Sequence, residues 1–128
     1  PISLKLNWMF KQIGQVKEFR TAFGLSNNVH DCDNELHQAL VTEELHEMIQ
    51  ANNHVEIADA IIDQMYLLIG YACNLQIEDK LEALFDEVHR SNMSKLDDNG
   101  QPIYRADGKV MKSDNYFKPN LKDILVTL

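Results

Sequence analysis

The stretch VTEELHEMIQANNHVEIADAIID, residues 41–63, decides how this chain folds. Apolar residues recur in it at the three- and four-residue spacing of an α-helix, and Asn52-Asn53 interrupt the pattern with a turn. It therefore predicts two antiparallel helices, the first from 33 or 34 to about 50 and the next from about 55 to 75. The same stretch holds six carboxylates, although its apolar pattern is that of helices packed in a core.

The rest of the chain adds two helices and a different kind of tail. Apolar spacing predicts a helix over about 7–22 and another over about 77–93. The Asp-Gly pair at 107–108 is flanked by short apolar runs at 103–104 and 110–111, which is typical of a small β-hairpin. The sequence FKPNLKDIL then predicts a C-terminal arm. We expect one all-α domain over residues 1–128, with a helical body over about 7–94 and a hairpin and tail over about 95–128.

Composition and charge limit the function classes. The chain has 128 residues, of which 45% are hydrophobic and 25% charged, as in one soluble globular domain. Its net charge of −8 argues against binding a nucleic-acid polymer, which needs a basic surface. The acids are concentrated in residues 1–88, whose net charge is −10, whereas residues 89–128 carry +2. An acidic helical body followed by a basic tail suggests a protein that handles a metal and an anion together.

Location and redox state follow from the same sequence. The longest apolar stretch, 57–75, is interrupted by Asp59, Asp63 and Gln64, so we expect no membrane-spanning helix and no membrane partner. The N-terminal residues lack a clean apolar signal segment, which predicts a cytoplasmic protein. Cys32 and Cys73 have no metal-binding spacing and are expected to be reduced thiols.

The carboxylates fall on particular helix faces. With about 100° per residue, Leu40 and Met48 lie within roughly 60° of Glu44, so Glu44 sits in the middle of the apolar stripe. Glu47 lies at the border of that stripe and Glu43 is turned further toward solvent. On the next helix Glu56, Asp59 and Asp63 lie within about 60° of one another. Because all other faces of that helix are apolar, we expect it to be buried together with its acids.

Counting outward from the turn brings the two sets of acids together. Glu47 comes level with Asp59, and Glu44 comes level with Asp63. Buried without partners, such carboxylates would cost on the order of several kcal/mol per ion, and each would raise the pKa of the others. No Lys or Arg occurs between Arg20 and Lys80, so local ion pairs are excluded. A hard divalent cation, Mg²⁺ or Mn²⁺, removes the conflict because it prefers oxygen ligands.

At these residues the chain resembles the all-α NTP pyrophosphohydrolase superfamily, which includes MazG, dimeric dUTPase, dCTP pyrophosphatase and phosphoribosyl-ATP pyrophosphohydrolase. The resemblance lies in Glu43-Glu44-Leu45-His46-Glu47, which matches EExxE, in the acids of the next helix, and in SNMSK, DGKVMK and NYFKP of the tail. It covers roughly residues 35–120. It implies a MazG-type, four-helix bundle-like oligomer that uses Mg²⁺ to hydrolyse a (deoxy)nucleoside triphosphate to monophosphate and pyrophosphate, in housecleaning or pool control.

The resemblance also implies roles for particular residues. Glu44 and Glu47 would bind metal, and the second motif can be read in two ways. Asp63-x-x-Tyr66 leaves Ala60 where the family has Glu, whereas Glu56-x-x-Asp59 restores the letters but shortens the interval. The full set of metal candidates is Glu44, Glu47, Glu56, Asp59 and Asp63. The catalytic candidates are Glu43, Glu44 and Glu47, with Glu56 as a further possible base for water. The substrate-binding candidates are Arg90, Asn92, Lys95, Lys109, Lys112 and Tyr116.

Two other classes remain open from the residues alone. Glu43-x-x-His46 and Asp86-x-x-His89 have the Glu-x-x-His type of spacing found in di-iron carboxylate bundles. His46, however, lies more than about 100° from the stripe that holds Glu44. The second class is a non-catalytic oligomeric interaction module, because the apolar helix over 55–75 predicts a homodimer or homotetramer interface in any case.

Overall fold

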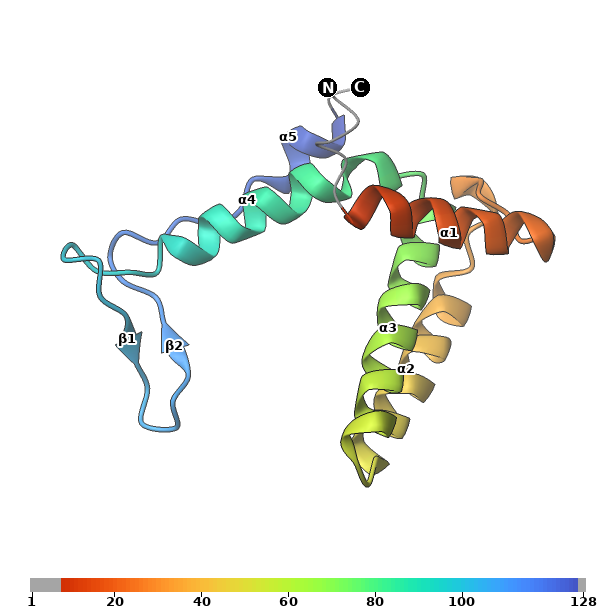
Figure 1. The fold of residues 1–128 in the computed structure, drawn as a ribbon. Coiled ribbons are helices and arrows are strands. Elements are labelled where there is room, and N and C mark those ends of the chain that lie inside the picture. The colour runs from red at the N-terminus through yellow and green to blue at the C-terminus, as the bar shows by residue number, and fades with distance from the viewer. Residues whose placement is uncertain (1–7, 127–128) are drawn as a thin grey trace. The chain divides into compact units, whose positions relative to one another are not determined.

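The computed structural model describes residues 8–126 of the chain, and its regular structure is mainly helical (Figure 1). The longer helices are α1 (Trp8–Ala22), α2 (Asn34–Gln50), α3 (His54–Asn74), α4 (Leu81–Met93) and α5 (Leu121–Val126). Short 3₁₀ turns cover Val29–Asp31 and Glu78–Lys80, and β1 (Ile103–Tyr104) pairs with β2 (Val110–Met111). These elements form two compact units, Pro1–Asp79 and Lys80–Leu128.

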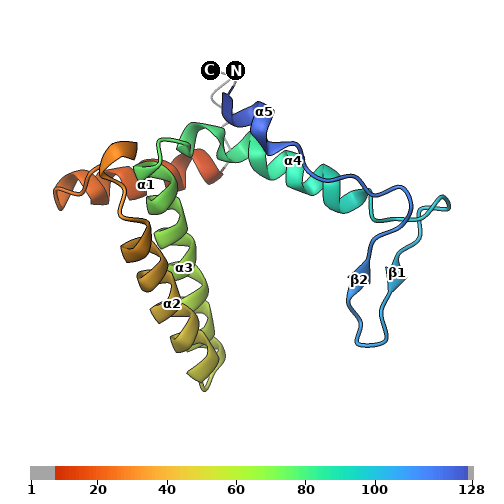
Figure 2. The same ribbon diagram turned by 180° about the vertical axis from the view of Figure 1, so that it is seen from behind.

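The first unit is built on the hairpin of α2 and α3, which pack against each other along their length, and on α1, which packs on α3 (Figures 1 and 2). Both hairpin helices begin with a side-chain cap, since Asp33 accepts from the Leu36 N–H and Asn53 from the Glu56 N–H. A small core joins α1 to α3, where Val16, Ile69 and Cys73 are buried and Ile13 packs against them.

Polar contacts fix the register of the hairpin. His37 Nε2 and Asn74 Oδ1 are 2.9 Å apart, and the His37 ring stacks on Tyr71 with 4.4 Å between ring centroids. Further toward the turn, Gln64 Nε2 approaches Met48 Sδ at 3.5 Å. The two helices are therefore antiparallel, as the sequence predicts, and contacts between them occur in both halves of the hairpin.

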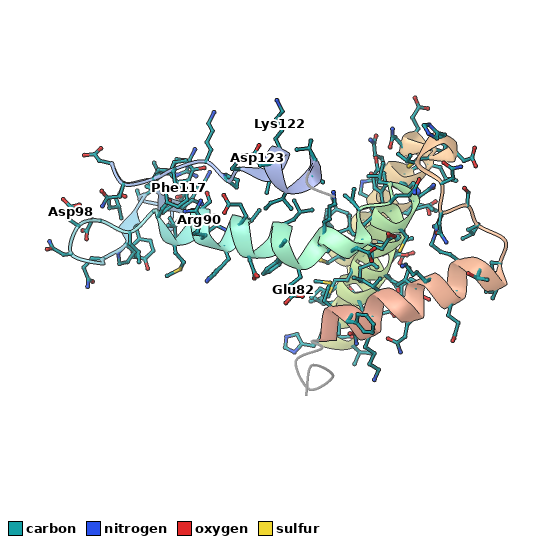
Figure 3. All side chains as sticks on the ribbon, turned by 90° about the horizontal axis from the view of Figure 1, so that it is seen from above. Glu82, Arg90, Asp98, Phe117, Lys122 and Asp123 are labelled. Atoms are coloured by element: carbon teal, nitrogen blue, oxygen red, sulfur yellow. The ribbon has the colours of Figure 1, made fainter. Side chains whose placement is uncertain are left out.

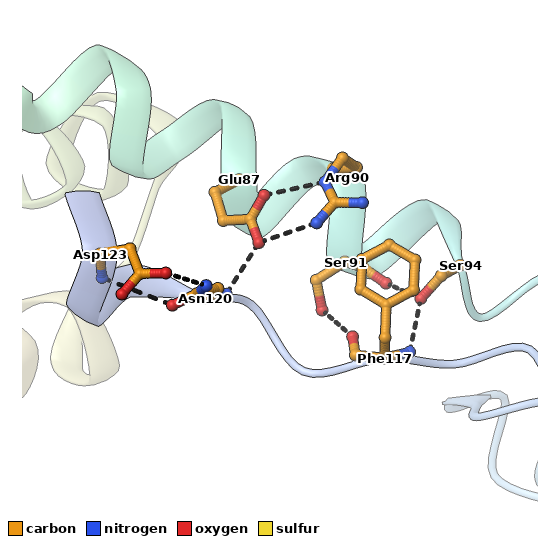
Figure 4. A network of polar contacts seen from close by, with 7 residues as sticks. All are labelled: Glu87, Arg90, Ser91, Ser94, Phe117, Asn120 and Asp123. Atoms are coloured by element: carbon orange, nitrogen blue, oxygen red, sulfur yellow. Dashed lines mark hydrogen bonds and ion pairs between the residues drawn. The ribbon is translucent and has the colours of Figure 1, made fainter.

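In the second unit α4 packs on α5. The segment 117–120, which precedes α5, is also hydrogen-bonded to α4. Ser91, which is 2% exposed, donates from Oγ to the Phe117 carbonyl at 2.8 Å, and the Phe117 N–H donates to Ser94 Oγ at 3.1 Å (Figure 4). The Asn120 N–H donates to Glu87 Oε2 at 2.7 Å. The backbone of residues 117–120 is therefore held on α4 through a carbonyl group that accepts and N–H groups that donate hydrogen bonds.

The secondary structure largely confirms the sequence prediction. Three of the four main helices lie within one residue of the expected bounds, whereas α4 begins four residues later than expected because residues 78–80 form a 3₁₀ turn. The hairpin is also confirmed, with Ile103 opposite Met111 and Gly108 at a φ of 89° in its turn. The arm ends in α5, a helix that the sequence reading did not predict. Among residues 8–126, no helix is both long and apolar enough to span a membrane.

Candidate active site

Glu44 is the most perturbed carboxyl group of the first unit. Its side chain is half-buried, and its Oε2 atom is enclosed with no hydrogen-bond partner in the described part of the chain. Loss of solvent, a hydrogen bond with Glu47, and the negative charges of Glu47, Asp63 and Asp59 together raise the pKa of Glu44 to about 7. Glu47, Asp63 and Asp59, which the sequence predicts to lie near Glu44, thus act on Glu44 electrostatically.

The neighbours of Glu44 differ in how far they are exposed. Asp63 is half-buried, whereas Glu47 and Asp59 are exposed. Glu47 and Asp59 line a hollow of about 270 Å³ together with Gln50 and Glu56. The expectation that α3 buries its acids on every side is therefore wrong for the single chain, because the two-helix hairpin leaves this face open to solvent.

The described side chains do not form a ready-made metal cage. Within residues 8–126 no three Asp, Glu, His or Cys groups are placed so that they hold one ion as they stand. The donors nevertheless suit Mg²⁺, since they are carboxylate oxygens and one of them, Glu44 Oε2, is buried without a partner. The exposed Glu47 and Asp59 side chains can reach other rotamers without disturbing the core.

Local structure bears on both readings of the second motif. Glu56 occupies the first turn of α3, where its Oε2 accepts from the Asn52 N–H at 2.7 Å and the Asn53 side chain caps the Glu56 N–H. This reciprocal arrangement resembles a capping box, so Glu56 has a structural task at the turn. Ala60, at the position where the family has Glu, is 2% exposed and offers no ligand. Asp59 and Asp63 are then the acids of α3 that act on Glu44.

The predicted substrate-binding residues all lie in the second unit, and the side chains of three of them, Arg90, Lys112 and Tyr116, make contacts there. Arg90 Nε lies 2.9 Å from Glu87 Oε1, and its guanidinium covers the Phe117 ring at 4.3 Å (Figures 3 and 4). This ion pair lowers the pKa of Glu87. The main cause is the hydrogen bond from Arg90, and the Asn120 N–H adds to it. Arg90 thus has a structural role in holding the tail, whether or not it also meets a substrate.

Lys112 and Tyr116 form a second contact in this unit, with Lys112 Nζ 4.6 Å from the centre of the Tyr116 ring. Lys95 is half-buried just after α4, whereas Asn92 and Lys109 are exposed. These residues place several cationic or amide groups on one compact unit, as the sequence grouping predicts.

Other residues differ from the sequence prediction or were missed by it. Glu43 and His46 are exposed and neither contributes to the pKa shift of Glu44, so Glu43 has the weakest structural support among the catalytic candidates. Gln50, which lines the acidic hollow, was not predicted, although its position three residues after Glu47 puts it on the same helix face. The spacing Asn53-x-x-Glu56 is typical of a capped helix start and indicates the capping role of Glu56.

The mainly helical fold, with acids on a two-helix hairpin, is the one expected for a MazG-like NTP pyrophosphohydrolase. A sequence profile of the phosphoribosyl-ATP pyrophosphohydrolase family matches residues 16–92, well over half of the chain, and the chain belongs to this family. The match includes every metal candidate but only Arg90 and Asn92 of the substrate-binding set. No curated protein matches the chain. Family membership makes this protein a pyrophosphohydrolase, a hydrolase acting on a nucleotide phosphoanhydride bond.

Proposed function

We propose that this protein hydrolyses (deoxy)nucleoside triphosphates to the monophosphate and pyrophosphate, in a reaction that depends on Mg²⁺ or Mn²⁺. The cation, when bound, would polarise the phosphate oxygens and make a bound water more acidic. Glu44, Asp63 and Asp59 would hold it, because Asp63 and Asp59 act on Glu44 from the opposite helix of the hairpin.

The observation that carries the proposal is the buried, unpartnered Oε2 of Glu44 among three other acids. A carboxylate in this position is unfavourable when charged, and the described part of the chain gives it no basic partner. A divalent cation turns the same cluster into a favourable one. The chain therefore carries, without a metal, an electrostatic cost that a binding site for Mg²⁺ would explain.

Glu47 is the residue we propose for the proton of the attacking water. It lines the open hollow, where water reaches it, and it neighbours Glu44. Glu56 has one oxygen committed to the Asn52 N–H, and Glu43 does not act on Glu44. The cationic groups of residues 90–112 are the candidates for balancing the charge of the phosphates.

We further propose that the protein is a homo-oligomer. The outer side of α3 exposes apolar side chains that neither α1 nor α2 covers, at 45–79% for the most exposed of them: Val55, Ile61, Ile62 and Leu68. Such a row on one helix favours burial against a second copy. Light scattering should give a dimeric or tetrameric mass, and Ile62→Glu should reduce it. A monomeric wild-type mass would contradict this part of the proposal.

A screen for pyrophosphate release tests the activity. Ribo- and deoxyribonucleoside triphosphates are incubated with the protein with and without Mg²⁺, and phosphoribosyl-ATP is included because the matched family is named for it. We expect pyrophosphate only with the cation, and a loss of about 100-fold or more in Glu44→Gln and Asp63→Asn, the scale expected for removing a catalytic charge. Full turnover in either variant would overturn the site assignment.

A further inference from the structure

Gln50 is the neutral member of the four residues that line the acidic hollow, whose other members are Glu47, Glu56 and Asp59. It is the last residue of α2 and is exposed, so water reaches its amide group. Within the described residues this amide makes no hydrogen bond to another side chain or to the backbone. Its carbonyl oxygen and its two N–H groups are therefore available to a water molecule or a ligand in the hollow.

Gln50 lies in one row with two glutamates of the proposed site. Glu44, Glu47 and Gln50 follow one another at intervals of three residues on α2, with a rise of about 4.5 Å per step. Side chains at this spacing are neighbours on a helix surface. The half-buried Glu44 is therefore followed by the exposed Glu47 and then, toward the turn of the hairpin, by the amide of Gln50.

The turn after α2 fixes the backbone of Gln50 and leaves its side chain free. The Ala51 N–H donates to the Met48 carbonyl at 3.3 Å, which closes the end of the helix. The Asn52 N–H donates to Glu56 Oε2 at 2.7 Å, which ties the turn to the start of α3. Gln50 thus extends from an anchored end of the helix, and rotation about its side-chain bonds can turn the amide into the hollow.

A water molecule that attacks phosphorus needs acceptors for both of its O–H groups. One O–H gives its proton to the general base, and the other has to be held so that a lone pair of the oxygen faces phosphorus. A second carboxylate in this place would add negative charge to the hollow and compete for the proton. An amide oxygen accepts the hydrogen bond without adding charge, and a glutamine orients the attacking water in GTPases.

We infer that Gln50 Oε1 accepts a hydrogen bond from the attacking water, whose other proton passes to Glu47. This inference rests on the proposed function, in which Glu47 is the base. The water oxygen bonds to phosphorus while the anhydride P–O bond breaks, and the electron pair of that bond leaves with the bridging oxygen. Glu47 passes its proton to solvent, and the second proton stays on the new phosphate oxygen. Gln50 thus acts on the nucleophile and leaves the binding of cation and nucleotide to other residues.

Gln50→Met tests this role, because methionine has a similar length, favours helices and lacks an amide oxygen. In the pyrophosphate-release assay with the preferred nucleotide and Mg²⁺, we expect kcat to fall about tenfold or more, the scale of a positioned polar group. The KM, the Mn²⁺ affinity and the Tm should stay close to the wild-type values. Gln38→Met, at an exposed position of the same helix, is the control and should keep the wild-type kcat.

Methanol as a competing nucleophile separates the orientation of water from a general loss of activity. Methanol has a single O–H, which gives its proton to the base, so it does not need the second acceptor. We expect the ratio of methyl ester to hydrolysis product, measured by mass spectrometry, to rise about fivefold or more in Gln50→Met. Gln50→Glu keeps an acceptor oxygen and should keep the wild-type ratio.

An unchanged kcat in Gln50→Met, or a lower kcat with an unchanged product ratio, would overturn the inference. A fall in Tm or in Mn²⁺ affinity that accompanies the loss of kcat would also overturn it, because Gln50 would then support the structure of the site. If wild type releases no pyrophosphate from any nucleotide, the proposed function fails and this inference fails with it. If wild type and Gln50→Met are equally active, the proposed function stands and the inference alone fails.

Discussion

Glu44 and Glu47 lie one turn apart on α2, and the neighbouring Glu47 carboxylate raises the pKa of Glu44. Burial is the main cause that raises the pKa of Glu44 to about 7, and Glu47 is the next. A surface pair of like charges would separate into solvent. Here the Oε2 atom of Glu44 is enclosed, so a charge on Glu44 is poorly solvated and the group is responsive to protons and to cations.

The stability of the metal-free protein should depend on pH through Glu44. Its folded pKa of about 7 lies above the ordinary value of 4.5, so its contribution is fully present below about pH 4.5 and is lost as the pH rises through 7. We expect the Tm of wild type to fall from pH 5 to pH 8 by more than that of Glu44→Gln, in buffer containing a chelator. Glu18→Gln, at an exposed position of α1, is the control and should keep the wild-type slope. Parallel slopes in wild type and Glu44→Gln would contradict the prediction.

The buried pair of His37 and Asn74 should contribute more to stability than the nearby hydrogen bond between Tyr71 and Asn34. Asn74 is 5% exposed, contacts His37 Nε2 and donates to the Asn28 carbonyl at 2.9 Å. Asn74→Leu leaves both partners unsatisfied and should lower the free energy of unfolding by about 2 kcal/mol. Tyr71→Phe, which loses a hydrogen bond to Asn34 nearer the surface, should cost at most about 1 kcal/mol. Urea unfolding measures both, and the reverse order would contradict the structure.

Ser91 should hold the tail of the second unit on α4. Ser91→Ala removes the hydroxyl that donates to the Phe117 carbonyl, and it should cost about 1 kcal/mol. Amide exchange should then become faster in residues 117–126 than in α4. Ala83→Ser, at an exposed position of the same helix, is the control and should leave this exchange unchanged. Unchanged exchange in Ser91→Ala would show that the tail is held by other contacts.

The fold followed closely from the sequence because its signals are local. The spacing of apolar residues in 41–63, the Asn52-Asn53 turn and the Asp107-Gly108 turn each specify a structure over a few residues. The counting that put Glu44 near Asp63 agrees with the electrostatic effect of Asp63 and Asp59 on Glu44, since a short turn leaves little freedom of register. These features allowed the four interacting acids to be predicted.

The rest of the site depends on contacts that local patterns do not contain. Arg20 and Asn74 look like ordinary polar residues in the sequence, and only the packing of α1, α2 and the loop before α2 around α3 shows that they are buried. The same holds for Arg90, whose pairing with Glu87 and Phe117 needs the tail to return along α4. The burial of the α3 acids was predicted too strongly, because periodicity tells which faces are apolar but not what covers them.

The most direct test of the central claim is a titration with Mn²⁺, followed by the electron paramagnetic resonance signal of the free ion. The account predicts that wild type and Glu18→Gln remove Mn²⁺ from solution with equal affinity, that Mg²⁺ competes, and that Glu44→Gln and Asp63→Asn each weaken binding at least tenfold. Mn²⁺ affinity that is the same in wild type, Glu44→Gln and Asp63→Asn would show that these acids do not hold a cation and would contradict the account.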